Sequence, residues 1–149
     1  MTNDLIVGST AVDAEAVEAI KNHHAQLAGR VAVLTDASLA AIERGADFEP
    51  ARAAILDFLT SELMPHAAAE EEHLYPAATR TERARPLVES MIAVHRVIGS
   101  LVERIRTESP VRAAASGHAL RVVFDAHLTD ENERILPIVA ADPDVSLAE

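Results

Sequence analysis

Apolar residues recur along the chain in alternating steps of three and four, the spacing of a helix that buries one face. Four segments show this spacing, so the sequence predicts four long helices. Their apolar positions are Val17, Ile20, Leu27, Val31 and Leu34 in the first, Ile55, Leu59 and Leu63 in the second, Val88, Met91, Ile98, Val102 and Ile105 in the third, and Leu120, Phe124, Ile135 and Ile138 in the fourth.

The ends of these helices are marked by residues that start or stop helices. Acidic residues suit a helix N-terminus, proline suits a first helical position, and glycine often follows a helix end. Pro65 lies inside the second helix, where it removes a backbone hydrogen bond, so a bend is expected just before His66. The expected boundaries are an opening at the acidic run around Asp13, Glu15 and Glu18, an end near Gly45, a second helix from about Pro50 to Pro76, a third starting close to Pro86, and a fourth from Ser109 and Pro110 to Asp142 and Pro143.

Short connections between long helices make neighbours antiparallel, so the expected fold is all-α, an up-down-up-down antiparallel four-helix bundle. A length of 149 residues fits one domain, 1–149, and the 3% aromatic content with abundant helix formers disfavours strands. The segment from Ser146 to Glu149 resembles a helix start at which the sequence stops. This leaves open that the domain is cut from a longer chain after residue 141.

The composition excludes several classes of function. A formal net charge of −11 argues against a nucleic-acid or anionic-membrane surface, because phosphate contacts need a basic patch. The absence of cysteine excludes disulfides, thiolate nucleophiles and cysteine-ligated metal sites. No apolar run approaches the ~18 residues of a membrane span, and the N-terminus does not resemble a signal peptide. A cytoplasmic protein without nucleic-acid or membrane partners is therefore expected.

Polar residues interrupt every apolar seam. The second and fourth helices carry a repeated sequence, HAAAEEEHLYP from His66 and HLTDENERILP from His127, in which glutamate follows histidine by four residues. Counted from the expected turns near residues 46, 80 and 110, most of the interruptions fall within about one helical turn of a single level. The interrupting residues are His24, His66, Glu70, His73, His95, His127 and Glu131.

A shared level has an energetic consequence. A carboxylate buried among apolar residues loses several kcal/mol of solvation unless a cation compensates it, and no lysine or arginine occupies the seam positions. Two glutamates and at least four histidines without thiolate therefore predict a metal site, with iron or manganese favoured over zinc. Six ligand side chains exceed what tetrahedral zinc binds, so two metals fit better than one. His24 is preferred to His23 as a ligand, because His24 continues the apolar seam.

At this point the sequence resembles the hemerythrin-like, or HHE cation-binding, family. The resemblance covers His24 to about Pro137 and rests on a single histidine, a histidine–glutamate pair, another single histidine and a second pair. It implies a four-helix bundle that holds two iron ions (Fe2+/Fe3+) with an oxo or hydroxo bridge. It also implies two bridging glutamates and four terminal histidines: Glu70 and Glu131, and His24, His66, His95 and His127.

The sequence departs from the oxygen-carrying members of the family in its third helix. Those members have two histidines four residues apart, whereas Met91 and Gly99 flank His95 at these positions. His73 is the expected replacement ligand, because it lies seven residues after His66 and returns to nearly the same face of a regular helix. Without His73, one iron has an additional open position, which favours peroxide or nitric oxide chemistry over simple O2 carriage.

Residues beside the motifs have plainer interpretations. Glu71, Glu72, Asp130 and Glu133 predict a solvated acidic face, from which one residue could orient a ligand imidazole. Tyr75 is expected to pack under the end of the second helix, with the alternative that its hydroxyl reaches the site.

Two classes of function follow. The first is a di-iron protein that binds or reduces a small oxidant, namely O2, hydrogen peroxide or nitric oxide. The second is a metal- or oxygen-responsive module without turnover, whose occupancy is sensed by a downstream domain or within a homo-oligomer. The sequence does not decide whether the protein is an enzyme.

Overall fold

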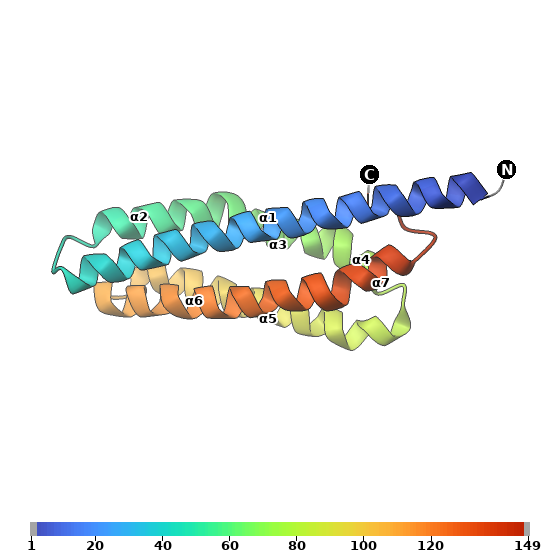
Figure 1. Ribbon diagram of the computed structural model, residues 1–149. Coiled ribbons are helices and arrows are strands. Elements are labelled where there is room, and N and C mark those ends of the chain that lie inside the picture. The colour runs from blue at the N-terminus through green and yellow to red at the C-terminus, as the bar shows by residue number, and fades with distance from the viewer. Residues whose placement is uncertain (1–2, 148–149) are drawn as a thin grey trace.

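The computed structural model describes residues 3–147, with side chains described from Asp13 onward. Every long element in this part of the chain is a helix, and the described residues contain no strand. The helices form four antiparallel columns (Figure 1). The all-α four-helix prediction is therefore confirmed.

The four columns are built from helices and, in two of them, from wider π-helical turns. We call the three segments Leu59–Leu63, Glu70–Leu74 and Glu131–Ile135 the wide turns. The first column is α1 (Asn3–Glu43); the second is α2 (Glu49–Phe58), α3 (Met64–Ala69) and α4 (Tyr75–Ala78), joined by two wide turns; the third is α5 (Arg85–Thr107), preceded by a 3₁₀ turn (Glu82–Ala84); the fourth is α6 (Pro110–Asp130) and α7 (Leu136–Ala141), joined by the third wide turn.

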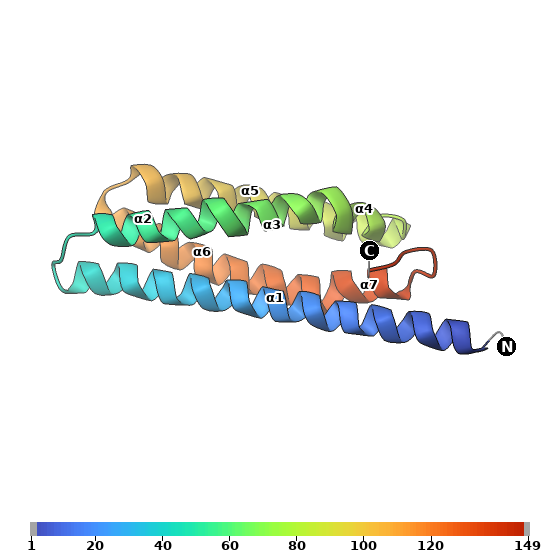
Figure 2. The same cartoon turned by 90° about the horizontal axis from the view of Figure 1, so that it is seen from above.

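Columns that are consecutive in the sequence lie side by side, and the fourth column packs against the first. Helix α1 packs beside α2 and α6, and α5 packs beside α6 and α2. Seen from above, α1 runs along the whole bundle and its N-terminal turns extend past α4 and α7 (Figure 2). Each column therefore contributes one face to a common interior.

Most boundaries lie within a residue or two of those expected, with two corrections. Helix α1 starts at Asn3 rather than at the acidic run near Asp13, because no proline between them interrupts helical hydrogen bonding. The second column continues past Pro76 to Ala78, since proline is tolerated in the first turn of α4. Gly45 has a φ of 63°, which glycine adopts without strain, and it reverses the chain after α1.

Each wide turn ends two residues before a proline, namely Pro65, Pro76 and Pro137. A proline has no N–H, and its ring clashes with the carbonyl four residues earlier; widening that turn relieves the clash without breaking the helix. At the place where a bend was expected before His66, the structure has a wide turn. Because such a turn holds one extra residue, side chains beyond it rotate by about 100° relative to a regular helix.

The apolar interior is divided in two by a polar layer. A large cluster containing Leu27, Leu63 and Ile98 lies on one side, and a smaller cluster containing Met91 and Ile135 lies on the other. The predicted seam residues of the second and third columns are all buried, whereas Val17, Ile20, Leu34 and Ile138 are half-buried. Val139 takes the place expected for Ile138, because the third wide turn shifts the helix by one residue.

By length and composition alone, α1 could cross a membrane, because an 18-residue window within Asp13–Glu43 has a mean hydropathy of 1.2. This is weak evidence, because core helices of proteins that never enter a membrane pass the same test. Here the helix packs against α2 and α6 and buries polar side chains, among them His24, Thr35 and Ser38.

Candidate metal centre

Six of the seven predicted ligand residues converge in the polar layer. They form two overlapping groups, and within each group one nitrogen or oxygen atom per residue lies within 4.8 Å of all the others. Glu70 and Glu131 belong to both groups. The groups are His24, His66, Glu70 and Glu131, and Glu70, His95, His127 and Glu131.

Local helix geometry places the two histidine–glutamate pairs. In each copy of the repeat the glutamate lies one turn after the histidine and begins a wide turn, so both side chains face inward before the helix widens. His66 Nε2 lies 3.4 Å from Glu70 Oε1, and His127 Nε2 lies 3.1 Å from Glu131 Oε1. His24 and His95 enter from α1 and α5 and complete the two groups.

The two carboxylates each span both groups. Glu131 Oε1 faces His127, while its Oε2 lies 3.5 Å from His24 Nε2. Glu70 Oε1 lies 3.4 Å from His66 Nε2 and 3.6 Å from His95 Nε2, and its Oε2 lies 3.7 Å from His24 Nε2. This is the placement that carboxylates shared between two cations require.

The outer nitrogens of two imidazoles are held by neighbouring side chains. His24 Nδ1 donates to Asn132 Oδ1 at 2.7 Å, and His95 Nδ1 donates to Glu71 Oε2 at 3.3 Å. Each contact fixes the ring and leaves Nε2 facing the centre, as in many metal-ligating histidines. Glu71 is therefore the acidic residue that orients a candidate ligand imidazole. Asn132 was not predicted, since its direction depends on the third wide turn.

A family model for the hemerythrin HHE cation binding domain matches residues 15–139. The chain belongs to this family. Neither the curated proteins nor the solved structures contain a match to it. The histidines and glutamates on which the resemblance rested are the residues that converge in this HHE domain.

His73 does not join the centre of the HHE domain, contrary to the expectation that it replaces the missing histidine. Its side chain is 73% exposed, and its nearest charged partner is the exposed Glu72 at 3.8 Å. The physical reason is the wide turn at Glu70–Leu74, which rotates His73 away from the face it would share with His66 in a regular helix. His24, and not His23, enters the cluster: His24 is buried, whereas His23 is exposed.

Tyr75 takes an inward position instead, so the alternative for its hydroxyl is the one observed. The hydroxyl donates to Glu131 Oε1 and lies 3.2 Å from His95 Nε2 and 3.4 Å from His127 Nε2. The sequence signal that could have found it is a polar residue at a buried repeat position: the second copy has Leu136 where the first has Tyr75.

The pKa values of the two carboxylates are shifted in opposite directions. Burial raises the pKa of Glu131, and the adjacent Glu70 carboxylate raises it further, which outweighs the contact with His127. Burial also opposes ionisation of Glu70, but hydrogen bonding with His24 and other imidazoles outweighs burial and holds its pKa far below the usual range. Burial lowers the pKa values of His24 and His95, yet their carboxylate partners outweigh it and raise both. In both imidazoles the shift favours the charged form beside the carboxylates.

Burial raises the pKa of the Tyr75 phenol, and the charges of Glu70 and Glu131 raise it further. The phenol is therefore protonated next to these carboxylates and acts there as a hydrogen-bond donor.

The residues fit a pair of cations. Five buried atoms of the cluster have no hydrogen-bond partner, and leaving a buried polar atom unpaired costs about 1–3 kcal/mol. Among the described ion pairs, none places a lysine or arginine against Glu70 or Glu131. Four of the five atoms face the shared centre, where coordination would satisfy them; the five are His24 Nε2, His66 Nε2, Glu70 Oε2, His127 Nδ1 and Glu131 Oε2.

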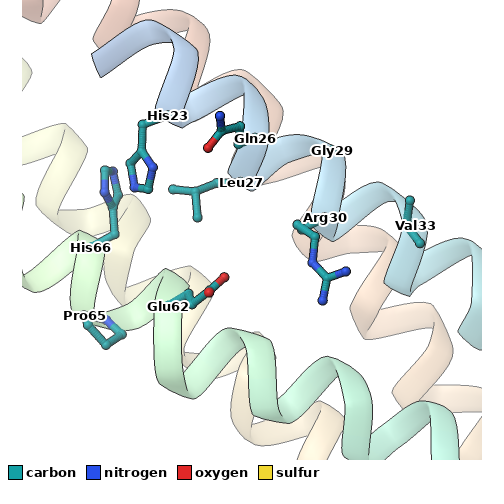
Figure 3. A pocket seen from close by; sticks show the side chains of 9 residues that line it. All are labelled: His23, Gln26, Leu27, Gly29, Arg30, Val33, Glu62, Pro65 and His66. Atoms are coloured by element: carbon teal, nitrogen blue, oxygen red, sulfur yellow. The ribbon is translucent and has the colours of Figure 1, made fainter. Parts of the chain in front are cut away.

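Two hollows border the His24 and His66 side of the centre. One is an open hollow of about 200 Å³ whose lining includes Ile20, His24, His66, Glu70 and the outer residue His73. The other is an open groove of about 930 Å³ between α1 and the second column (Figure 3). His66 lines both, so this side of the HHE centre borders accessible space.

Proposed function

We propose that this HHE domain holds two iron ions and binds or reacts with a small oxidant: O2, hydrogen peroxide or nitric oxide. The observation that carries the proposal is the pair of overlapping groups, each with two imidazoles, that share Glu70 and Glu131. Each group offers nitrogen and oxygen donors without thiolate, which suits iron better than zinc. When bound, iron supplies open coordination positions and one-electron steps.

The protein's own residues determine what reaches this centre. The hollow of about 200 Å³ has room for a diatomic molecule or a peroxide, and Ile20 and Leu74 give it apolar walls. Asn132 and Glu71 keep the imidazole rings of His24 and His95 oriented toward the centre. These features support a small ligand as the partner.

Metal analysis combined with an absorption spectrum tests the proposal. Protein produced with added iron should contain two irons per chain and should absorb near the blue end of the visible spectrum when oxidised. Glu70→Ala should lose iron and this absorption, while Glu72→Ala, whose side chain is 75% exposed, should keep both. Colourless, iron-free wild-type protein would contradict the proposal, and stable loading with zinc or manganese alone would redirect the metal assignment.

The second candidate is a metal- or oxygen-responsive module without turnover. It is favoured by the origin of the ligands, because each group draws on three of the four columns, so occupancy must change the stability of the bundle. Repeated consumption of hydrogen peroxide by the iron-loaded protein would favour the enzyme. Stoichiometric binding that shifts only the melting temperature would favour the module.

A further inference from the structure

Tyr75 lies at a buried position where the two copies of the repeated sequence differ in chemistry. It is nine residues after His66, as Leu136 is nine residues after His127, and both side chains are buried. The phenol ring fills space as the leucine does and stacks on the His95 ring, with centroids 5.5 Å apart. Leucine cannot supply the hydroxyl, which lies among the atoms of the centre.

The hydroxyl and its neighbours have the spacing of atoms around one metal ion. The Nε2 atoms of His95 and His127 are 2.9 Å apart, and the Tyr75 hydroxyl lies 3.2 and 3.4 Å from them. Glu131 Oε1 lies 3.1 Å from His127 Nε2 and accepts from Tyr75. For ligand atoms bound at about 2.0–2.1 Å, geometry places neighbours about 3.0 Å apart at right angles and about 3.4 Å apart at tetrahedral angles.

A hydrogen-bond role alone leaves this arrangement incomplete. The phenol has one proton, and Glu131 Oε1 accepts it. The two Nε2 atoms can share at most one proton between them, although both face the same small space. Four donor atoms whose lone pairs converge in this way are the environment of a cation.

We propose that Tyr75 is a protein ligand at the metal position formed by His95, His127 and Glu131. On coordination the phenol O–H bond breaks, a metal–oxygen bond forms, and the proton leaves to solvent; no electron is transferred. Tyr75 thus takes the ligand role expected of His73. The wide turn at Glu70–Leu74 is the reason, because beyond it Tyr75 rather than His73 faces the centre. The proposal rests on the proposed iron centre.

The composition makes the test unusually direct. Tyr75 is the only tyrosine and the chain has no tryptophan, so every tyrosine signal reports this residue. Resonance Raman spectra of the ferric protein, excited in the visible, should show ring vibrations of a metal-bound tyrosinate. Adding zinc to metal-free protein should independently produce a tyrosinate difference spectrum in the ultraviolet.

Two variants complete the experiment. Tyr75→Phe keeps the ring, and it should lose both signals and release metal from one of the two positions about tenfold more readily to a chelator. Thr35→Val is the matched control, because it removes another buried hydroxyl, whose hydrogen bond goes to Val31 O outside the centre. This control should behave as wild type does.

The outcomes separate this proposal from the proposed function. Two bound irons without tyrosinate vibrations overturn the ligand role of Tyr75 and leave the di-iron proposal standing. A Tyr75→Phe protein that releases metal to a chelator no faster than wild type has the same meaning. Failure to bind iron overturns both. If Tyr75→Phe does not fold, the wild-type Raman spectrum still decides, since it has a single tyrosine source.

Discussion

At the scale of single residues, adjacent positions with the same chemistry have different surroundings, and this gives matched tests. Glu71 contacts His95 Nδ1, whereas Glu72 pairs only with the exposed His73. The convergence of six residues could be predicted, because the two histidine–glutamate pairs precede their wide turns and the helices of His24 and His95 contain none, so regular helix geometry applies. His73 could not, because its direction depends on the extra residue in Glu70–Leu74.

Glu71→Ala should lower metal affinity about 10- to 100-fold, because His95 loses the partner that orients its ring. Isothermal titration with a competing chelator measures the effect. Glu72→Ala is the control and should bind as wild type does. Equal affinities for the two variants would show that the Glu71 contact does not support the centre.

Glu131→Gln should stabilise the metal-free protein while weakening metal binding. Glu131 is fully buried beside the Glu70 carboxylate, and both disfavour its charged form, so a neutral amide suits the metal-free site better. We expect a gain of about 1–3 kcal/mol and a rise of several degrees in the melting temperature without metal. The exposed Glu133→Gln serves as control. A lower melting temperature for metal-free Glu131→Gln would contradict this account.

At the scale of elements, prolines determine where the helical period fails. Each wide turn precedes a proline by two residues, so the sequence locates the bends, and the one before Pro65 could be predicted. The size of the rotation could not, because a proline can break, kink or widen a helix and local pattern does not choose among these. This unpredicted rotation explains why both His73 and Ile138 were wrongly expected to face inward. After the last wide turn the buried residue is Val139.

A second element-scale feature joins α2 to the end of α5. The guanidinium of Arg52 donates to the carbonyl of Ile105, pairs with Glu49 and lies 5.1 Å from the centroid of the Phe48 ring. It therefore caps a helix end whose carbonyls would otherwise lack partners.

Arg52→Ala should lower stability by about 1–2 kcal/mol, since a partly buried charged donor and its packing are lost. The melting temperature should fall by about 2–8 °C in thermal unfolding followed by circular dichroism. Arg106→Ala, which removes only an exposed pair with Glu103, should shift it by much less. Similar shifts for the two variants would mean that the capping bond contributes little.

At the scale of the whole molecule, the fold class followed from periodicity, turn length and composition, because a bundle needs only apolar faces and short connections. The position of the centre along the bundle also followed, since residues equidistant from the turns lie at one level. What did not follow is the division of the interior into two apolar clusters of unequal size, which depends on how far each column continues beyond the polar layer.

Removing metal should destabilise the entire bundle. Metal bound at a thousandfold excess over its dissociation constant adds about 4 kcal/mol, which corresponds to a rise of about 8–16 °C in melting temperature for a domain of this size. Thermal unfolding with and without a chelator measures the difference, and Glu70→Ala should show none. Superimposable melting curves for loaded and stripped wild-type protein would contradict metal binding at the buried cluster.

The first and last columns meet at His24 and Glu131, so a filled centre acts as a cross-link that closes the ring of helices. No single column can then swing away while the others keep their ligands. Amide protons in the middle of all four columns should exchange with solvent at one common slow rate when metal is present, and at separate, faster rates once it is stripped. Local unfolding of the metal-bound protein is then confined to the two ends of the columns.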